Sequence, residues 1–195
     1  TIANGTVKST GANGGSAIAN NGTLTADNVT LNGAPNDGSG WPAYTVNNTG
    51  TMTISNSNIT SHHGAVCSYA TDAVITMNNT NIEMSGIAGF TNHGIYTYDG
   101  GKVFVNGGNI ANNATDQNST GGSVINGTVE VTAGNFTGRI ENYYGTPVLK
   151  GGNYSVKPKD AFIAGGYEAV EKDGKWYVVA EDVTVVATTL DDVNA

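Results

Sequence analysis

A repeated apolar pattern is the feature that most constrains how this chain folds. Six segments align without gaps, and they begin at Gly22, Gly50, Ala73, Gly101, Gly127 and Gly145. The fifth position of each is apolar, as Ala26, Ile54, Met77, Val105, Val131 and Leu149. The tenth is apolar too, as Leu31, Ile59, Ile82, Ile110, Phe136 and Tyr154, and Ile2 and Val7 fit these two positions of an earlier, truncated repeat. Such a period is typical of a solenoid, whose repeats bury apolar faces by stacking on one another.

Each repeat predicts three short strands. One carries the fifth-position residue, the second is centred on the tenth position, and runs such as Gly64-Ala65-Val66-Cys67 form the third. Asn stands at the ninth position of five consecutive repeats, where stacked amides are expected to bond along the column and to tolerate a tight turn. These residues are Asn58, Asn81, Asn109, Asn135 and Asn153. We therefore predict an all-β fold, a right-handed parallel β-helix of about seven coils over residues 1–156.

The composition agrees with this fold and excludes several functions. The 195 residues include 28 Gly, 25 Asn and 25 Thr, which excludes a helical bundle or a helix-rich enzyme. No apolar run reaches the ~18 residues of a membrane span, so no membrane insertion is expected. The net charge is -8, and only Lys8, Lys102 and Arg139 are basic before residue 150, which argues against binding of nucleic acid. A polar but weakly charged surface predicts an extracellular protein of a bacterial cell surface or a virion surface.

A different pattern follows the repeats. Pro158 is placed to open a short helix through Ala164, and Asp173-Gly174 is a hairpin signal between residues 168–172 and 175–179. This helix and hairpin, residues 157–181, are expected to cap the last coil, because an uncapped β-helix exposes a strand edge. Residues 182–195 are interpreted as a linker or the start of a further unit, and the full polypeptide is expected to continue.

Residues 1–156, with their stacked apolar repeats, resemble the right-handed parallel β-helix superfamily of pectate-lyase-like fold. The stretch from Gly151 to Val179 also resembles a closing module of surface proteins of gut bacteria and of fibres or capsid decorations of their phages. This second resemblance implies a surface module and says nothing about catalysis; the non-catalytic interpretation rests on the scarcity of paired acids. The first raises an alternative, because many pectate-lyase-like proteins are polysaccharide lyases or hydrolases.

A depolymerase would need two acids on one face of the rod. No two acids before residue 150 share an aligned strand position, and only Asp72 and Asp99 occupy comparable places on adjacent coils. We therefore name Asp72 and Asp99, near His93, as the catalytic residues of this alternative. Turn acids are more often solvated or capping groups, and the single arginine, Arg139, is expected to pair locally with Glu141.

Loops along one edge of the rod are the best candidates for binding. His63 and His93 end the loops before two aligned strands and should stack, but they offer too few ligands for a metal, so no metal site and no cofactor are expected. The single cysteine, Cys67, is interpreted as a small buried residue. Aromatic rings among amides and hydroxyls suit sugar rings, although Trp41 and Phe90 could equally fold back over the core. The predicted glycan contacts are Trp41, His63, Phe90, His93, Tyr143 and Tyr144.

These observations predict a non-enzymatic structural or adhesive module displayed outside a cell, as an adhesin, a phage fibre or a capsid decoration. Its expected partners are cell-surface glycans, other surface or virion proteins reached through flanking regions, and further copies of itself. The sequence leaves the choice between a bacterial and a phage origin open. The alternative function is a polysaccharide depolymerase.

Overall fold

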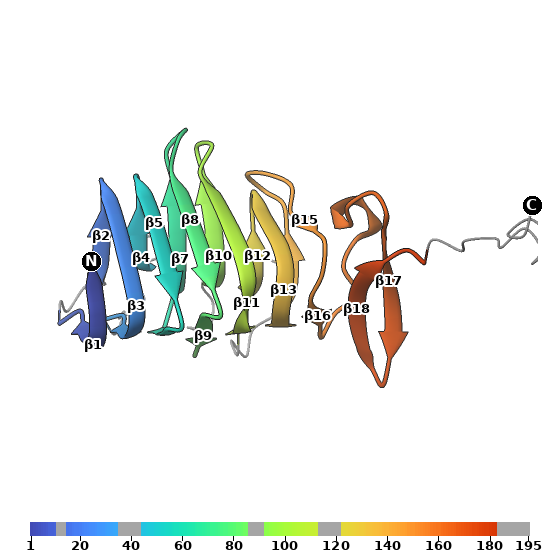
Figure 1. Ribbon diagram of the computed structural model, residues 1–195, viewed down its shortest axis with the longest axis horizontal. Helices are drawn as coiled ribbons and strands as arrows, with labels where there is room; N and C mark the ends of the chain where they lie inside the picture. The colour runs from blue at the N-terminus through green and yellow to red at the C-terminus, as the bar shows by residue number, and fades with distance from the viewer. Residues whose placement is uncertain (11–14, 35–43, 86–91, 113–121, 183–195) are drawn as a thin grey trace, which may run out of the picture.

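The structure is a computed structural model that describes residues 1–10, 15–34, 44–85, 92–112 and 122–182 (Figure 1). Over these residues the chain is all-β and winds into a parallel β-solenoid, as predicted. Trp41 and Phe90 lie outside the described residues, as does most of the predicted unit 182–195. No helix in the described ranges is long and apolar enough to cross a membrane.

Two sheets run along the solenoid. Sheet A has twelve strands: Ile2–Lys8 (β1), Thr23–Asn32 (β3), Thr51–Ser55 (β5), Asn58–Ser61 (β6), Val74–Asn78 (β8), Asn81–Met84 (β9), Lys102–Asn112 (β11), Val129–Thr137 (β13), Val148–Leu149 (β15), Asn153–Tyr154 (β16), Tyr167–Lys172 (β17) and Lys175–Ala180 (β18). Sheet B has six: Ile18–Asn20 (β2), Tyr44–Asn48 (β4), Gly64–Tyr69 (β7), Asn92–Tyr98 (β10), Gly122–Asn126 (β12) and Arg139–Glu141 (β14). All pairings are parallel except those of β18 with β16 and β17.

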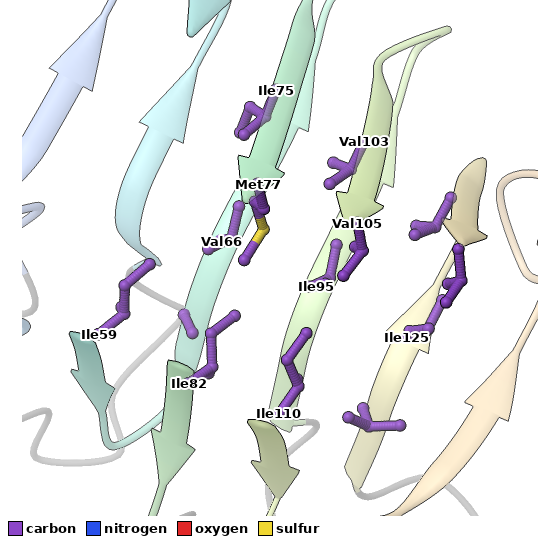
Figure 2. Close-up of a cluster of buried hydrophobic side chains, with 14 of the residues drawn as sticks. Ile59, Val66, Ile75, Met77, Ile82, Ile95, Val103, Val105, Ile110 and Ile125 are labelled. Atoms are coloured by element: carbon purple, nitrogen blue, oxygen red, sulfur yellow. The ribbon is translucent and has the colours of Figure 1, made fainter. Parts of the chain in front are cut away.

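The parallel register stacks the repeat positions that the sequence predicts. Ile2 pairs with Ala26 and Val7 with Leu31, so the truncated first repeat also falls into line. The fifth- and tenth-position residues of the six full repeats are all buried, and residues from sheet B, including Val66, Ile95 and Ile125, complete the core (Figure 2). Each fully buried aliphatic side chain contributes about 1.5–3 kcal/mol to stability.

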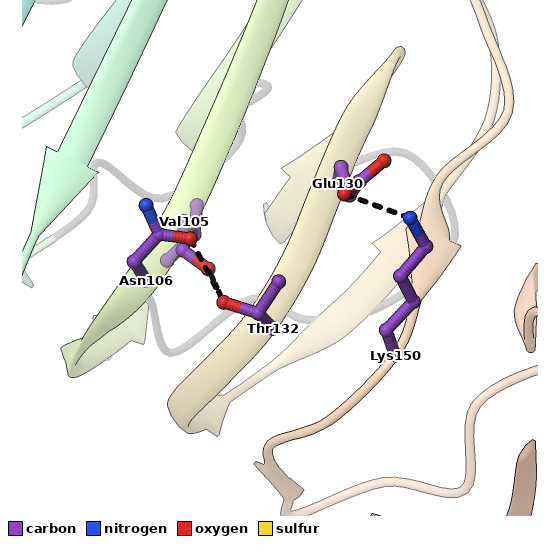
Figure 3. A network of polar contacts seen from close by, with 5 residues as sticks. All are labelled: Val105, Asn106, Glu130, Thr132 and Lys150. Atoms are coloured by element: carbon purple, nitrogen blue, oxygen red, sulfur yellow. Dashed lines mark hydrogen bonds and ion pairs between the residues drawn. The ribbon is translucent and has the colours of Figure 1, made fainter. Parts of the chain in front are cut away.

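The asparagine column of the ninth position is confirmed. Asn81 donates to Asn58 at 3.0 Å, Asn135 to Asn109 at 2.6 Å and Asn153 to Asn135 at 2.6 Å. Further polar contacts join neighbouring coils, since Thr132 Oγ1 donates to Asn106 Oδ1 at 2.8 Å and Lys150 Nζ lies 2.9 Å from Glu130 Oε1 (Figure 3). The outer surface of sheet A therefore satisfies much of its polarity by bonding along the solenoid.

The tight turn is made by other asparagines than those of this column. Asn28, Asn56 and Asn79, at the seventh position, have φ angles of 51°, 49° and 46°. An asparagine tolerates this left-handed conformation better than most residues because its short side chain can bond locally. The turn role predicted for the ninth position thus belongs two residues earlier.

The solenoid is shorter than predicted, with about four turns in place of about seven. The rows at its two ends are incomplete. To sheet A the first repeat supplies β1 alone, and the last repeat supplies β15 and β16, which have two residues each.

The predicted helix over residues 158–164 is wrong. Only a 3-10 turn forms, Asp160–Phe162 (η1), and no side chain caps its start. Ile163 returns to an extended conformation and forms a parallel bridge with Leu149, so burial of Phe162 and pairing with the last coil outweigh helix formation.

The predicted hairpin is present as β17 and β18. Its turn is Asp173-Gly174, with φ angles of 53° and 74°. β18 pairs with β16 and extends sheet A past the last coil (Figure 1). Tyr167, Trp176 and Val178 pack against the core from this hairpin, which closes the C-terminal end of the solenoid.

Candidate functional site

The outer face of sheet B carries exposed tyrosines. Alternate residues of a strand point to opposite sides of the sheet. Ile95 of β10 lies in the core, so Tyr96 and Tyr98 of the same strand face outward. Tyr98 pairs in register with Tyr69 of β7, and the two side chains are 48% and 40% exposed. Neighbouring coils thus present tyrosines side by side.

Tyr96 is the centre of a larger ring cluster. It stacks on His93 with ring centroids 4.9 Å apart and on Tyr44 with centroids 5.6 Å apart. The ring of Tyr144 meets it edge-on at 5.7 Å and meets Tyr98 edge-on at 5.0 Å. Such pairs contribute about 0.5–1.5 kcal/mol each beyond area burial. We call Tyr44, Tyr69, His93, Tyr96, Tyr98 and Tyr144 the aromatic patch.

Two small features of the backbone position this patch. A Cβ added to Gly64 would lie 2.6 Å from the Tyr44 ring, so the missing side chain lets the ring lie over β7. Asn126 of β12 accepts a hydrogen bond from the Tyr143 N–H at 3.0 Å, which fixes the turn that carries Tyr144. The patch is therefore positioned by the strands of sheet B and by the turn after β14, which the hydrogen bond to Asn126 fixes in place.

Three polar side chains of the patch, those of His93, Tyr44 and Tyr96, have shifted pKa values. His93 Nδ1 lies 2.8 Å from Ser123 Oγ. Burial, and secondarily the neighbouring His63, lower the pKa of His93 to about 4. Burial also raises the pKa values of Tyr44 and Tyr96. The imidazole and both phenols are thus uncharged at neutral pH.

Cys67 is buried, as interpreted from the sequence. Burial raises the pKa of its thiol to about 12. A thiolate is the reactive form of cysteine, so this group is a poor nucleophile at neutral pH.

The structure brings together part of the predicted glycan-contact set. His93 and Tyr144 belong to the aromatic patch, and Tyr143 borders it with 71% of its side chain exposed. His63 is only 2% exposed, so it is not a surface contact. Its backbone carbonyl accepts the N–H of His93 at 3.1 Å and so helps to position that residue.

Sequence reasoning missed Tyr44, Tyr69, Tyr96 and Tyr98. These tyrosines lie on strands, whereas the prediction searched the loops. The alternation of Ile95, Tyr96, Thr97 and Tyr98 was an available signal, because a core residue at 95 turns 96 and 98 outward.

The residues named for a depolymerase are only partly grouped. Asp72 and Asp99 occupy exposed turns after Tyr69 and Tyr98, on neighbouring coils as predicted. His93 is the second residue of β10, which ends at Tyr98 just before Asp99, and six residues of extended chain span about 20 Å. The imidazole and the Asp99 turn therefore lie near opposite ends of β10, and a catalytic role for these residues stays a prediction.

Other charged groups near sheet B form local pairs. Arg139 lies 3.7 Å from Glu141, as expected, and Lys159 lies 3.6 Å from the same carboxylate, which connects β14 to the capping segment. Among the residues described, no three His, Cys, Asp or Glu side chains are grouped so that they could hold a metal ion.

The chain matches no protein-family model, no curated protein and no solved structure. Function must therefore be argued from the site itself, since a solenoid fold alone does not specify an activity.

Proposed function

We propose that this chain is a non-enzymatic β-helix module displayed outside a cell, on a bacterial surface or a virion, where it serves as a rigid structural or adhesive element. We further propose that it contacts glycans through the aromatic patch. The observation that carries the proposal is the exposure of Tyr69 and Tyr98 on the outer face of sheet B and of Tyr144 in the turn that packs against Tyr98.

The exposed rings offer a surface that suits a sugar. One face of a pyranose ring is largely apolar C–H, and it packs on an aromatic ring while its hydroxyls reach neighbouring polar groups. Tyr98 and Tyr144 are 48% and 51% exposed, and their rings meet edge to face. Together the two rings present an apolar surface on which one face of a sugar can pack. Tyrosine also loses little conformational entropy on binding, because it has only two side-chain torsions.

The charges around the patch favour a neutral glycan over an acidic one. Asp72 and Asp99 lie in the exposed turns that follow Tyr69 and Tyr98. The chain as a whole carries a net charge of -8. A polymer of uronic or sialic acids would meet repulsion from these carboxylates.

Binding to a panel of neutral and acidic glycans tests the proposal. We expect a neutral glycan to bind the wild type and to lose at least about tenfold in affinity with Tyr98→Ala or Tyr144→Ala, because aromatic anchors dominate such contacts. Val148→Ala, an exposed apolar position on sheet A, is the matched control and should bind normally. Unchanged affinity in both tyrosine variants would refute the patch.

Two further measurements address the remaining parts of the proposal. Assays for reducing ends and unsaturated products over the same panel are expected to show no cleavage, and cleavage lost in Asp72→Asn or Asp99→Asn would instead favour the depolymerase. Mass spectrometry of cell-surface fractions and of purified virions should find the chain there. Recovery mainly from cytosol would contradict external display.

A further inference from the structure

In the part of the chain that the structure describes, sheet A ends in a strand with a free edge. β17 is the terminal strand of the sheet, and within the described residues it pairs with β18 alone. The backbone groups on its other side therefore lack a strand partner there. A free edge of this kind is a template for another strand.

The hairpin geometry shows which backbone groups face that edge. A two-residue turn with both φ angles positive makes the flanking residues, Lys172 and Lys175, a hydrogen-bonded pair. Hydrogen-bonded and non-bonded pairs alternate along an antiparallel ladder. Glu168, Val170 and Lys172 thus bond toward β18, and the N–H and C=O groups of Ala169 and Glu171 point to the free edge.

We propose that β17 pairs antiparallel with β17 of a second copy of this chain, centred on Val170. Ala169 then exchanges both hydrogen bonds with Glu171 of the second copy, and the reverse pair forms by symmetry. The two Val170 side chains meet at a non-hydrogen-bonded position, where opposing side chains lie closest. This is a closed two-fold contact, which uses the same surface on both copies.

The charges along β17 select this register. With Val170 at the centre, Glu168 lies opposite Lys172 of the second copy, and this opposite-charge pair occurs twice. Centring on Ala169 places Glu168 opposite Val170, and centring on Glu171 sets two glutamates against each other. Opposite charges stabilise a cross-strand pair and like charges destabilise it, so the register centred on Val170 is favoured.

The exposed surface of the hairpin fits the same contact. Val170 is 41% exposed, and it lines a shallow hollow of ≈ 420 Å³ together with Lys172, Tyr177 and Val179. The opposite face of the hairpin is used by the solenoid core, through Tyr167, Trp176 and Val178. Self-pairing would cover the exposed Val170 and leave that packing unchanged.

Charge reversal offers a sharp test by sedimentation velocity over a concentration series. We expect a wild-type dimer that is weakened at least about tenfold by Glu168→Lys and by Lys172→Glu, and restored when the two variants are mixed in equal amounts. In the mixed dimer both cross-strand pairs again have opposite charges. Glu83→Lys and Lys102→Glu make the same charge changes at exposed positions of the solenoid and should leave the dimer intact.

Hydrogen exchange provides an independent readout of the pairing. The amides of Ala169 and Glu171 are expected to gain protection as the concentration of the wild type rises. Any of three results would overturn the proposal. The chain could stay monomeric up to about 1 mM, the dimer could keep its affinity in both charge-reversal variants, or the protection of these amides could be independent of concentration.

Discussion

The outer faces of sheets A and B cover one shared core but differ in character. The face of sheet A is repetitive, and its asparagines bond to the same residue one coil away, as Asn81 does with Asn58. The face of sheet B does not repeat, since Cys67 and Tyr96 pair in register and differ in size, polarity and exposure. A surface that satisfies its own polar groups along the rod has little left to offer a ligand. The broken repeat of sheet B leaves tyrosine rings exposed.

Removing core volume under either face should have the largest effect. Ile75→Ala beneath sheet A and Ile95→Ala beneath sheet B each delete a fully buried side chain, and we expect a loss of about 2–5 kcal/mol in the free energy of unfolding. Only Ile95→Ala should also weaken glycan binding, because Ile95 adjoins Tyr96. Urea unfolding and binding titrations measure the two effects. Equal loss of glycan binding in both variants would show that binding does not depend specifically on sheet B.

Sheet B should show a pH effect that comes from His93. The folded pKa of His93 is about 4, below the ordinary 6.5, so the unfolded chain takes up a proton first as the pH falls. Stability should therefore drop between pH 6.5 and 4, by at most about 3 kcal/mol, and the loss is complete below pH 4. His93→Gln should flatten this part of the stability curve, measured by denaturation at several pH values. His62→Gln, at an exposed histidine next to His63, is the control. If it flattened the stability curve as much as His93→Gln does, the pH effect would not come from His93.

Breaking the asparagine column of sheet A should have a smaller effect. Asn81 donates to Asn58 and accepts the N–H of Asn109 at 2.9 Å, so Asn81→Ala removes two exposed hydrogen bonds. We expect a loss of about 1–2 kcal/mol in stability and no change in glycan affinity. Thermal unfolding and a binding titration check this, with Thr51→Ala on the same face as the control. A change in affinity would place ligand contacts on sheet A.

The ion pair on sheet A should matter least. Lys150 and Glu130 lie 2.9 Å apart, but their side chains are 37% and 33% exposed. Solvent screening limits such a pair, so Lys150→Met should change the free energy of unfolding by about 0.5 kcal/mol or less. The effect should shrink further at high salt, and a larger, salt-independent loss would indicate a packing role for Lys150.

The sequence predicted the repetitive parts of this molecule better than the unique ones. Each core position recurs in six repeats, so chance substitutions such as Ala26 do not hide the pattern. The hairpin was predictable because Asp173-Gly174 is a specific turn signal. The helix from Pro158 was not, because pairing of Ile163 with Leu149 is a tertiary effect that local propensity does not contain.

The candidate site was only partly predictable for a related reason. Tyr144 and His93 drew notice as polar or aromatic residues near loops. Tyr96 stacks on His93 of its own strand and on Tyr44 of β4, two strands away in sheet B, and this geometry follows only once the register of the sheet is known. The alternation of Tyr96 and Tyr98 around Thr97 predicts that both tyrosines point outward from the sheet. It does not predict which side chains of neighbouring strands they contact.

The most direct test of the difference between the two faces is a chemical-shift map of the isotopically labelled chain titrated with a glycan that binds it. We expect the largest shifts at Tyr69, Tyr98 and Tyr144 on sheet B, and none above the noise at Asn81 or Asn135 on sheet A. Shifts concentrated along the asparagine column, with the tyrosines unmoved, would contradict the account.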